Sequence, residues 1–136
     1  MIVIDTNIVL DAFVFDDAST GALKAALDGK QIVWLATQPM RDELERVLSY
    51  PLIVKRLLRA QRGAADVLAQ FDGRVQIVEV APRASIRCRD PDDQKFVDLA
   101  LAHTASLLSK DRALLCLSRR LLAHGVRTQA NYQVSP

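Results

Sequence analysis

Four acidic residues of this chain have the type and the spacing to do chemistry together: Asp5, Glu43, Asp93 and Asp111. Bringing several ionised carboxylates into one crevice is unfavourable unless a cation neutralises their charge. Oxygen ligands without a set of His or Cys ligands suit Mg²⁺ or Mn²⁺. A divalent ion held in this way orients a phosphate, lowers the pKa of an attacking water and stabilises the charge on the leaving oxygen, so the acids predict phosphoryl chemistry.

The positions of Asp5 and Asp111 indicate one edge of a parallel sheet. Asp5 directly follows the apolar run 2–4, and Asp111 follows the run 105–108 after two intervening residues. Both acids are therefore expected just beyond the carboxyl ends of strands, where α/β proteins place their ligand crevices. Taken singly, each acid could instead be an ordinary turn or helix N-cap residue.

Asp93 and Glu43 are expected beside the apolar stripes of two helices. Asp93 shares a helical face with its stripe, whereas Glu43 borders its own stripe and can face a cleft. A Glu at the border of a stripe is, by itself, as well explained as a surface residue. The stripe of Asp93 comprises Phe96, Val97, Ala100 and Thr104, and the stripe beside Glu43 comprises Met40, Leu44, Val47 and Leu48.

Other acids near these positions have simpler explanations. Asp90 and Asp92 precede or open the helix that carries Asp93, where acids cap free N–H groups and meet the positive end of the helix dipole. Asp42 and Glu45 project away from the neighbouring apolar stripe and are expected to be solvated. We therefore interpret these four residues as caps or surface charges.

Short apolar runs alternate with helical patterns along the chain. The runs that predict buried strands are 2–4, 32–35, 75–80 and 105–108, with a short fifth strand opening at Val126. The stretch 37–74 must hold at least two helices. This alternation predicts a three-layer α/β/α sandwich around a central parallel sheet of four to five strands, formed by a single domain over residues 1–136.

Composition narrows the function classes. The 136 residues are 50% hydrophobic and 25% charged, which excludes a disordered or low-complexity chain. The net charge of +2 argues against an evenly basic nucleic-acid binder, so any basic surface is local. No run is long enough to span a membrane and no signal segment is seen, while Cys88 and Cys116 form no CxxC pair. We expect a cytoplasmic protein with reduced thiols.

A basic segment could hold a nucleic-acid backbone. Lys55, Arg56, Arg59 and Arg62 lie in a stretch, 51–65, that contains no acid. On a helix, Lys55, Arg59 and Arg62 would share a face and could neutralise phosphates flanking the acids, or they could simply be a solvated face. Further candidates are Arg112, beside Asp111, and the group Arg83, Arg87 and Arg89. Aromatic residues make up only 5% of the chain, so base stacking has little support.

At these residues the sequence resembles PIN-domain ribonucleases, in particular the single-domain bacterial, VapC-like group classed as toxins of toxin-antitoxin systems. The resemblance spans nearly the whole chain. It rests on Ile4-Asp5-Thr6-Asn7, on Glu43-Leu44 with Val47-Leu48 and Pro51, on the run CRDPDDQKFVDLALA from Cys88, and on Leu107-Leu108-Ser109-Lys110-Asp111-Arg112. It implies a PIN-like fold and Mg²⁺- or Mn²⁺-dependent hydrolysis of RNA that leaves a 5′-phosphate and a 3′-hydroxyl.

By this resemblance the catalytic, metal-binding residues are the four acids Asp5, Glu43, Asp93 and Asp111. Our hypothesis gives direct metal contacts to the three aspartates, while Glu43 binds through water or helps to hold a second ion. Supporting roles in orienting a carboxylate or a phosphate fall to Thr6, Asn7 and Ser109, for which turn capping is an equal alternative. The expected partners are RNA and an antitoxin protein, a homodimer is allowed, and no membrane is involved.

Two other α/β classes do not fit, and two related alternatives stay open. A phosphatase of the haloacid-dehalogenase type needs a second Asp two positions after Asp5, where this chain has Asn7. A receiver domain needs paired acids there and an Asp on its third strand. The open alternatives are a non-catalytic PIN-like module that binds another protein, and a PIN nuclease that processes RNA without an antitoxin.

Overall fold

The computed structural model describes residues 1–133 and is built on a five-stranded sheet. Its strands are β1 (Ile2–Ile4), β2 (Trp34–Ala36), β3 (Val75–Ile77), β4 (Ser106–Leu108) and β5 (Thr128–Gln129). All neighbouring strands run parallel, in the order β3-β2-β1-β4-β5. The predicted parallel sheet of four to five strands is confirmed.

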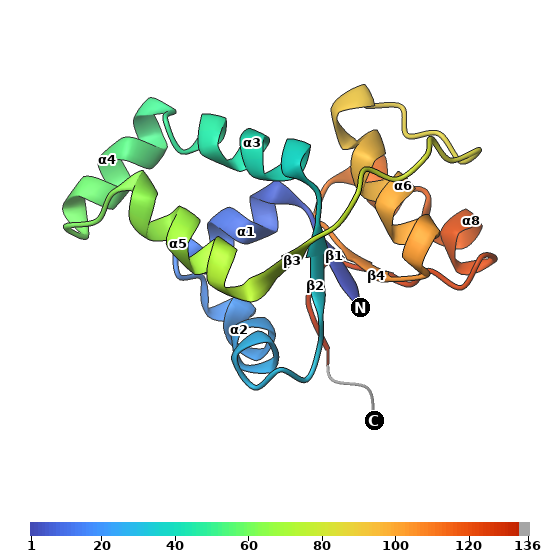
Figure 1. Cartoon of the computed structure of the whole chain (residues 1–136), viewed down its shortest axis with the longest axis horizontal. Helices are drawn as coiled ribbons and strands as arrows, with labels where there is room; N and C mark the ends of the chain where they lie inside the picture. The colour runs from blue at the N-terminus through green and yellow to red at the C-terminus, as the bar shows by residue number, and fades with distance from the viewer. Residues whose placement is uncertain (134–136) are drawn as a thin grey trace.

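Helices cover both faces of this sheet and form the two outer layers. The α-helices are α1 (Thr6–Phe13), α2 (Gly21–Asp28), α3 (Gln38–Val47), α4 (Pro51–Arg59), α5 (Ala64–Arg74), α6 (Gln94–His103), α7 (Arg112–Leu115) and α8 (Ser118–Leu122), with 3₁₀ turns η1 (Ala18–Thr20) and η2 (Pro91–Asp93). Helices α1 to α5 lie on one side of the sheet, and α6 and α8 lie on the other (Figure 1). The predicted α/β/α sandwich is therefore confirmed. None of the helices in residues 1–133 has the length and apolarity needed to cross a lipid bilayer.

The core forms where the sheet meets its helices. Ile2, Val3 and Ile4 are all at most 4% exposed, as expected for a strand covered on both faces. Trp34 on β2 packs parallel to Phe13, with ring centroids 6.1 Å apart, and edge-on to Phe71, with centroids 5.0 Å apart. These aromatic contacts join α1 and α5 to the sheet.

Several strand boundaries differ from the predicted ones, because an apolar run can extend beyond the residues that pair in the sheet. The run 32–35 starts before the sheet does: Val33 is 45% exposed and β2 begins at Trp34. The run 75–80 pairs only over β3, because its neighbour β2 ends at Ala36 and leaves little backbone to bond. Thr104, expected on the apolar stripe of α6, is instead its exposed cap in a left-handed conformation.

The connections between strands define where a ligand crevice should lie. In the sheet, β2 and then β3 lie on one side of β1, whereas β4 and then β5 lie on its other side. The carboxyl ends of β1 and β4 are thus the point at which the strand order reverses, which is where open α/β sheets bind ligands. The register pairs Ile4 with Leu108, so the residues that follow these strands face one another.

Candidate active site

A buried serine joins the ends of β1 and β4. The Ser109 hydroxyl donates a hydrogen bond to Oδ2 of Asp5 at 2.7 Å and accepts one from the backbone N–H of Asp111 at 2.9 Å. Asp5 is 4% exposed, and its side chain is bonded to Ser109 rather than capping α1. Burial raises the pKa of Asp5 above its ordinary value, against the lowering effect of the Ser109 hydrogen bond.

Three carboxylates converge beside Asp5. Oxygen atoms of Asp90, Asp93 and Asp111 all lie within 4.8 Å of one another. Asp93 is 8% exposed, and its buried Oδ2 atom has no hydrogen-bond partner among the described residues. Burial, followed by the nearby Asp111 carboxyl and the charge of Asp5, raises the pKa of Asp93 to about 7. A bound cation would relieve both the repulsion and the unpartnered oxygen, so these all-oxygen ligands fit a divalent metal.

The structure adds Asp90 to the acids predicted from the sequence. Its interpretation as a cap is correct, since Asp90 Oδ1 accepts the backbone N–H of Asp92 at 3.0 Å, but it is incomplete. Asp111 likewise combines two roles, because its Oδ1 accepts the N–H of Ala113 at 2.8 Å. One sequence signal could have identified Asp90: it stands three residues before Asp93, a spacing that places two side chains on one side of a helical turn.

The segment 78–90, which contains no helix or strand, brings Asp90 to the cluster. Two side chains of α6 hold its backbone. Buried Gln94 accepts the N–H of Cys88 at 2.6 Å and donates to the carbonyl of Ile86 at 3.0 Å. Asp98 accepts from the N–H of Ala84 and from Gln94, both at 2.8 Å. The approach to Asp90 is therefore fixed by hydrogen bonds rather than by regular structure.

Glu43 reaches the same edge from α3, on the other side of the sheet from α6. It forms an ion pair with Lys95 of α6, with 2.5 Å between Oε2 and Nζ. Its negative charge contributes to the raised pKa of Asp5, although Glu43 is not among the three clustered acids. The predicted orientation of α3 is confirmed, because Asp42 and Glu45 are both exposed.

The polar residues after Asp5 are placed differently from each other. Thr6 is buried in the first turn of α1, and Asn7 is exposed beside it. Within residues 1–133 neither side chain makes a hydrogen bond. Of the three predicted supporting residues, only Ser109 is thus bonded to one of the acids through its side chain, while the backbone N–H of Asn7 acts to lower the pKa of Asp5.

The basic segment is not the continuous helical face that was predicted. Lys55, Arg56 and Arg59 are exposed on α4, but the helix ends there, and Arg62 follows Gln61, whose φ is +55°. The prediction that Arg62 shares a face with Lys55 and Arg59 is therefore wrong. Moreover, α4 lies beyond α3, on the far side from α6 (Figure 1).

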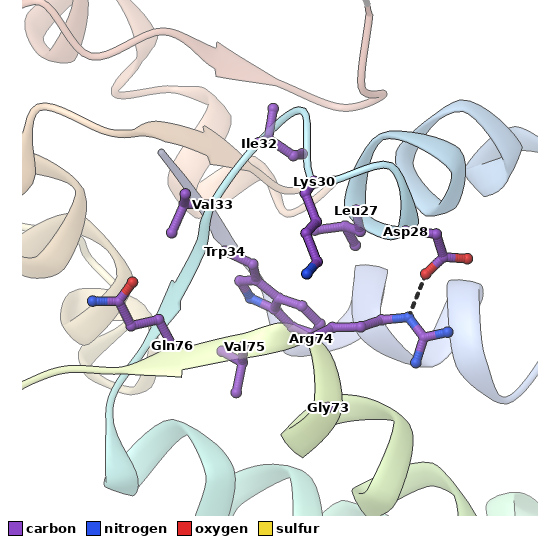
Figure 2. Close-up of a pocket in the computed structure, with 10 residues that line it drawn as sticks. All are labelled: Leu27, Asp28, Lys30, Ile32, Val33, Trp34, Gly73, Arg74, Val75 and Gln76. Carbon is purple, nitrogen blue, oxygen red and sulfur yellow. Dashed lines mark hydrogen bonds and ion pairs between the residues drawn. The ribbon is translucent and has the colours of Figure 1, made fainter.

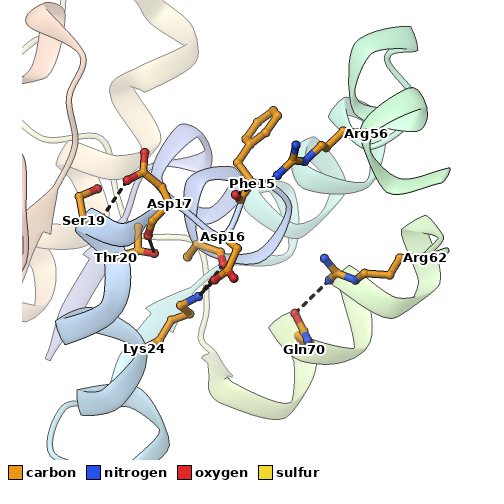
Figure 3. A network of polar contacts seen from close by, with 10 residues as sticks. Phe15, Asp16, Asp17, Ser19, Thr20, Lys24, Arg56, Arg62 and Gln70 are labelled. Carbon is orange, nitrogen blue, oxygen red and sulfur yellow. Dashed lines mark hydrogen bonds and ion pairs between the residues drawn. The ribbon is translucent and has the colours of Figure 1, made fainter. Parts of the chain in front are cut away.

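Two of these cations also make internal contacts (Figure 3). Arg56 donates to the carbonyl of Phe15 at 3.4 Å and stands over its ring, 5.9 Å from the centroid. Arg62 donates to Oε1 of Gln70 at 3.3 Å. By contrast, two exposed arginines among the predicted cations lie directly beside clustered acids in the chain: Arg112 follows Asp111, and Arg89 precedes Asp90.

A hollow of about 510 Å³ lies at the opposite edge of the sheet, where β2 and β3 begin (Figure 2). Trp34 and Val75 line it, together with Lys30 and with Arg74, which is paired with Asp28 at 2.8 Å. It contains none of the clustered acids. The acids are the stronger candidate site because converging, partly buried carboxylates favour a bound cation, whereas an open hollow need not hold a ligand.

Comparison with known proteins identifies the family of the chain. The model of the PIN domain family matches residues 1–113, which include Asp5, Glu43 and all three clustered acids. The search of curated proteins gives no match. With a match over most of its length, this chain belongs to the PIN domain family, whose members are generally nucleases that use divalent metal ions.

Proposed function

We propose that this protein is a Mg²⁺- or Mn²⁺-dependent ribonuclease that hydrolyses RNA phosphodiester bonds. One observation carries the proposal: three carboxylates converge within 4.8 Å at the reversal point of a parallel sheet, and one of them keeps a buried oxygen without a partner. A structural ion-pair network would instead satisfy its buried oxygens. The cluster is therefore arranged for a ligand that the protein itself does not supply.

The residues of the crevice have distinct tasks in this proposal. Asp90, Asp93 and Asp111 would hold the ion, with Asp5 beside them. The ion would orient a phosphate, lower the pKa of a water and stabilise the leaving oxygen. Ser109 fixes the orientation of the Asp5 carboxylate, because a hydroxyl that already accepts from the Asp111 backbone directs its proton to Asp5.

RNA is supported as the substrate by the surroundings of the cluster and by the sequence resemblance. Arg87, Arg89 and Arg112 are exposed within a few residues of Asp90 or Asp111, where they would contact phosphates on either side of the cleaved bond. Phosphate contacts of this kind hold a backbone without reading its bases. We therefore expect weak sequence preference from these arginines alone.

A cleavage assay tests the proposal. RNA and DNA oligonucleotides of one sequence, labelled at either end, are incubated with the protein and Mn²⁺, Mg²⁺ or excess chelator. We expect metal-dependent cleavage of RNA that leaves a 5′-phosphate and a 3′-hydroxyl, loss of cleavage in Asp5→Asn, and normal cleavage in the surface control Asp42→Asn. Cleavage that persists in chelator, or that is restricted to DNA, would contradict the assignment.

A toxin role is the finer part of the proposal, and with it an antitoxin partner and a cytoplasmic site of action. It is supported by the resemblance described above and by the free thiols Cys88 and Cys116, which suit a reducing compartment. Leu52 and Leu58 of α4, 79% and 69% exposed, provide apolar surface for a protein partner or a second copy. Co-expression with any small open reading frame beside the gene tests the antitoxin, and the molar mass in solution tests the dimer.

The non-catalytic alternative makes the opposite prediction in the same experiments. A PIN-like binding module would bind its protein partner tightly and would leave RNA intact at every metal concentration. An RNA-processing nuclease without an antitoxin would cleave RNA but would not arrest growth when expressed alone.

A further inference from the structure

Lys95 places a positive charge among the carboxylates of the crevice. It stands two residues after Asp93, and its side chain is 27% exposed. Its ammonium group contacts Oε2 of Glu43 at 2.5 Å, donates to the backbone carbonyl of Asp92 and lies 4.9 Å from the ring centroid of Phe96. Three separate contacts therefore hold this cation in one position.

The ammonium group contacts the oxygen of Glu43 that a metal ion would otherwise bind. Oε2 of Glu43 is buried, and Lys95 is its charged partner within residues 1–133. Oxygen atoms of Asp90, Asp93 and Asp111 lie within 4.8 Å of one another, and Glu43 is not a member of this group. The acids at this edge therefore form two groups. The cluster of three aspartates keeps an unpartnered oxygen on Asp93, whereas Glu43 is already neutralised by the ammonium group of Lys95.

We propose that the Lys95 ammonium takes the place of a second divalent ion, so that the centre binds one ion at Asp90, Asp93 and Asp111 and keeps Glu43 out of the metal's coordination shell. This inference rests on the proposed metal centre and assigns its stoichiometry. Lys95 is in this sense a positioning residue, which acts through Glu43.

Electrostatics gives the reason. A divalent ion at Glu43 would sit at contact distance from a fixed ammonium group in a partly buried site, where repulsion between like charges is weakly screened. For the ion to enter, Lys95 would also have to give up its contacts with Glu43, Asp92 and Phe96. An ion at the aspartate cluster meets neither obstacle, since Asp93 offers a free oxygen there.

Titration with Mn²⁺ measures the stoichiometry directly. The samples are the intact wild-type protein, Lys95→Gln, Lys95→Arg and the double variant Lys95→Gln/Glu43→Gln, followed by calorimetry and by electron paramagnetic resonance. We expect one Mn²⁺ per chain for the wild type and Lys95→Arg, and two for Lys95→Gln, with magnetic coupling between neighbouring ions. The double variant should return to one ion, because the carboxylate that held the second is gone.

Each departure from this pattern has a definite meaning. Two ions in the wild type, or one ion in a folded Lys95→Gln, would overturn the inference and leave the nuclease proposal intact. Absence of Mn²⁺ binding in the wild type would instead contradict the metal centre itself. Lys24→Gln serves as the matched control, since it removes a lysine from its ion pair with Asp16 outside the crevice and should bind one ion.

Discussion

The acidic crevice and the basic segment of α4 are both conspicuous in the sequence, yet the fold treats them in opposite ways. The acids come from positions 5, 90, 93 and 111 and meet through β1, η2 and the end of β4. The cations from 55 to 62 are neighbours in sequence but end up on an exposed helix and the turn that follows it. Distant residues brought into burial are thus a stronger sign of function than adjacent residues left at the surface.

The two regions also differ in how their polar atoms are satisfied. Arg56 and Arg62 are at the surface, where they make hydrogen bonds with Phe15 and Gln70 and water can satisfy their remaining N–H groups. Asp93 retains a buried oxygen without a partner and a pKa near 7. Burial of an unsatisfied carboxyl costs stability, and such a cost persists in proteins chiefly where a ligand or a reaction makes use of it.

The largest expected effect comes from removing the buried carboxylate of the cluster. Asp93→Asn keeps the shape of the side chain but removes a metal ligand, so we expect RNA cleavage to fall by on the order of 10³-fold while the fold is retained. Initial rates and circular dichroism measure the two quantities. If Asp93→Asn cleaved RNA as fast as Asp42→Asn, the distinction between crevice and surface would fail.

The pH dependence of protein stability without metal tests the same carboxyl group of Asp93. The folded-state pKa of Asp93, about 7, lies above its ordinary value of 3.8. The contribution of this group to stability is therefore complete below the ordinary pKa and is lost as the pH rises through 7. In chelator the melting temperature should fall by at least about 5 °C between about pH 5 and pH 8. Mn²⁺ should reverse the loss at the higher pH, because it favours the ionised carboxylate. An equal fall in Asp93→Asn would assign the effect to other groups.

Ser109→Ala should have an intermediate effect. It removes the hydrogen bond that orients Asp5 and leaves the N–H of Asp111 without its acceptor. Residues that orient metal ligands typically change activity or metal affinity by about 10–100-fold, and we expect a loss within this range. The unfolding free energy should fall by about 1–3 kcal/mol, measured by urea denaturation. A fully active Ser109→Ala would show that Asp5 needs no orientation.

The smallest expected effect is on the salt dependence of RNA binding, which distinguishes the arginines beside the acids from those of the basic segment. Gln substitution of Arg89 and Arg112, beside the acids, should make the slope of log affinity against log salt shallower by up to about two units. The same change at Arg59 and Arg62 should alter the slope less, because α4 lies away from the cluster (Figure 1). Both pairs should leave turnover at saturating RNA nearly unchanged. A larger slope change at the second pair would restore α4 as the main path of the RNA.

Most of the fold could be predicted from hydrophobic periodicity. The runs at β1 and β4 were placed to within a residue because these central strands are buried on both faces, and burial is what the sequence pattern records. Strand ends were less predictable because they depend on the partner. The residues after β3 remain apolar, but β2 has already ended, so only the N–H of Val78 still bonds to Ala36.

The acids were predictable to the extent that they follow strands or border helices. Asp90 was assigned only as a cap, because its second role depends on the path of 78–90, which has no periodicity to interpret. The contact between Glu43 and Lys95 was not predictable either, since it depends on how α3 and α6 approach each other across the sheet. The error at Arg62 came from continuing the helical periodicity beyond Arg59. The helix α4 ends there, and Gln61 has a positive φ.

The hydrogen bonds of the crevice also differ in how far apart in sequence their partners are. Those that position Asp90 join residues 6 to 14 apart within one loop and helix. The bond from Ser109 to Asp5 joins residues 104 apart and requires β1 to pair with β4. Short loops close faster than long ones during folding, so the segment that carries Asp90 and Asp93 can form locally, whereas Asp5 joins these acids only after β1 has paired with β4. The hydrogen bond from Ser109 to Asp5 would therefore appear late in folding, as a signal that the central strands have paired.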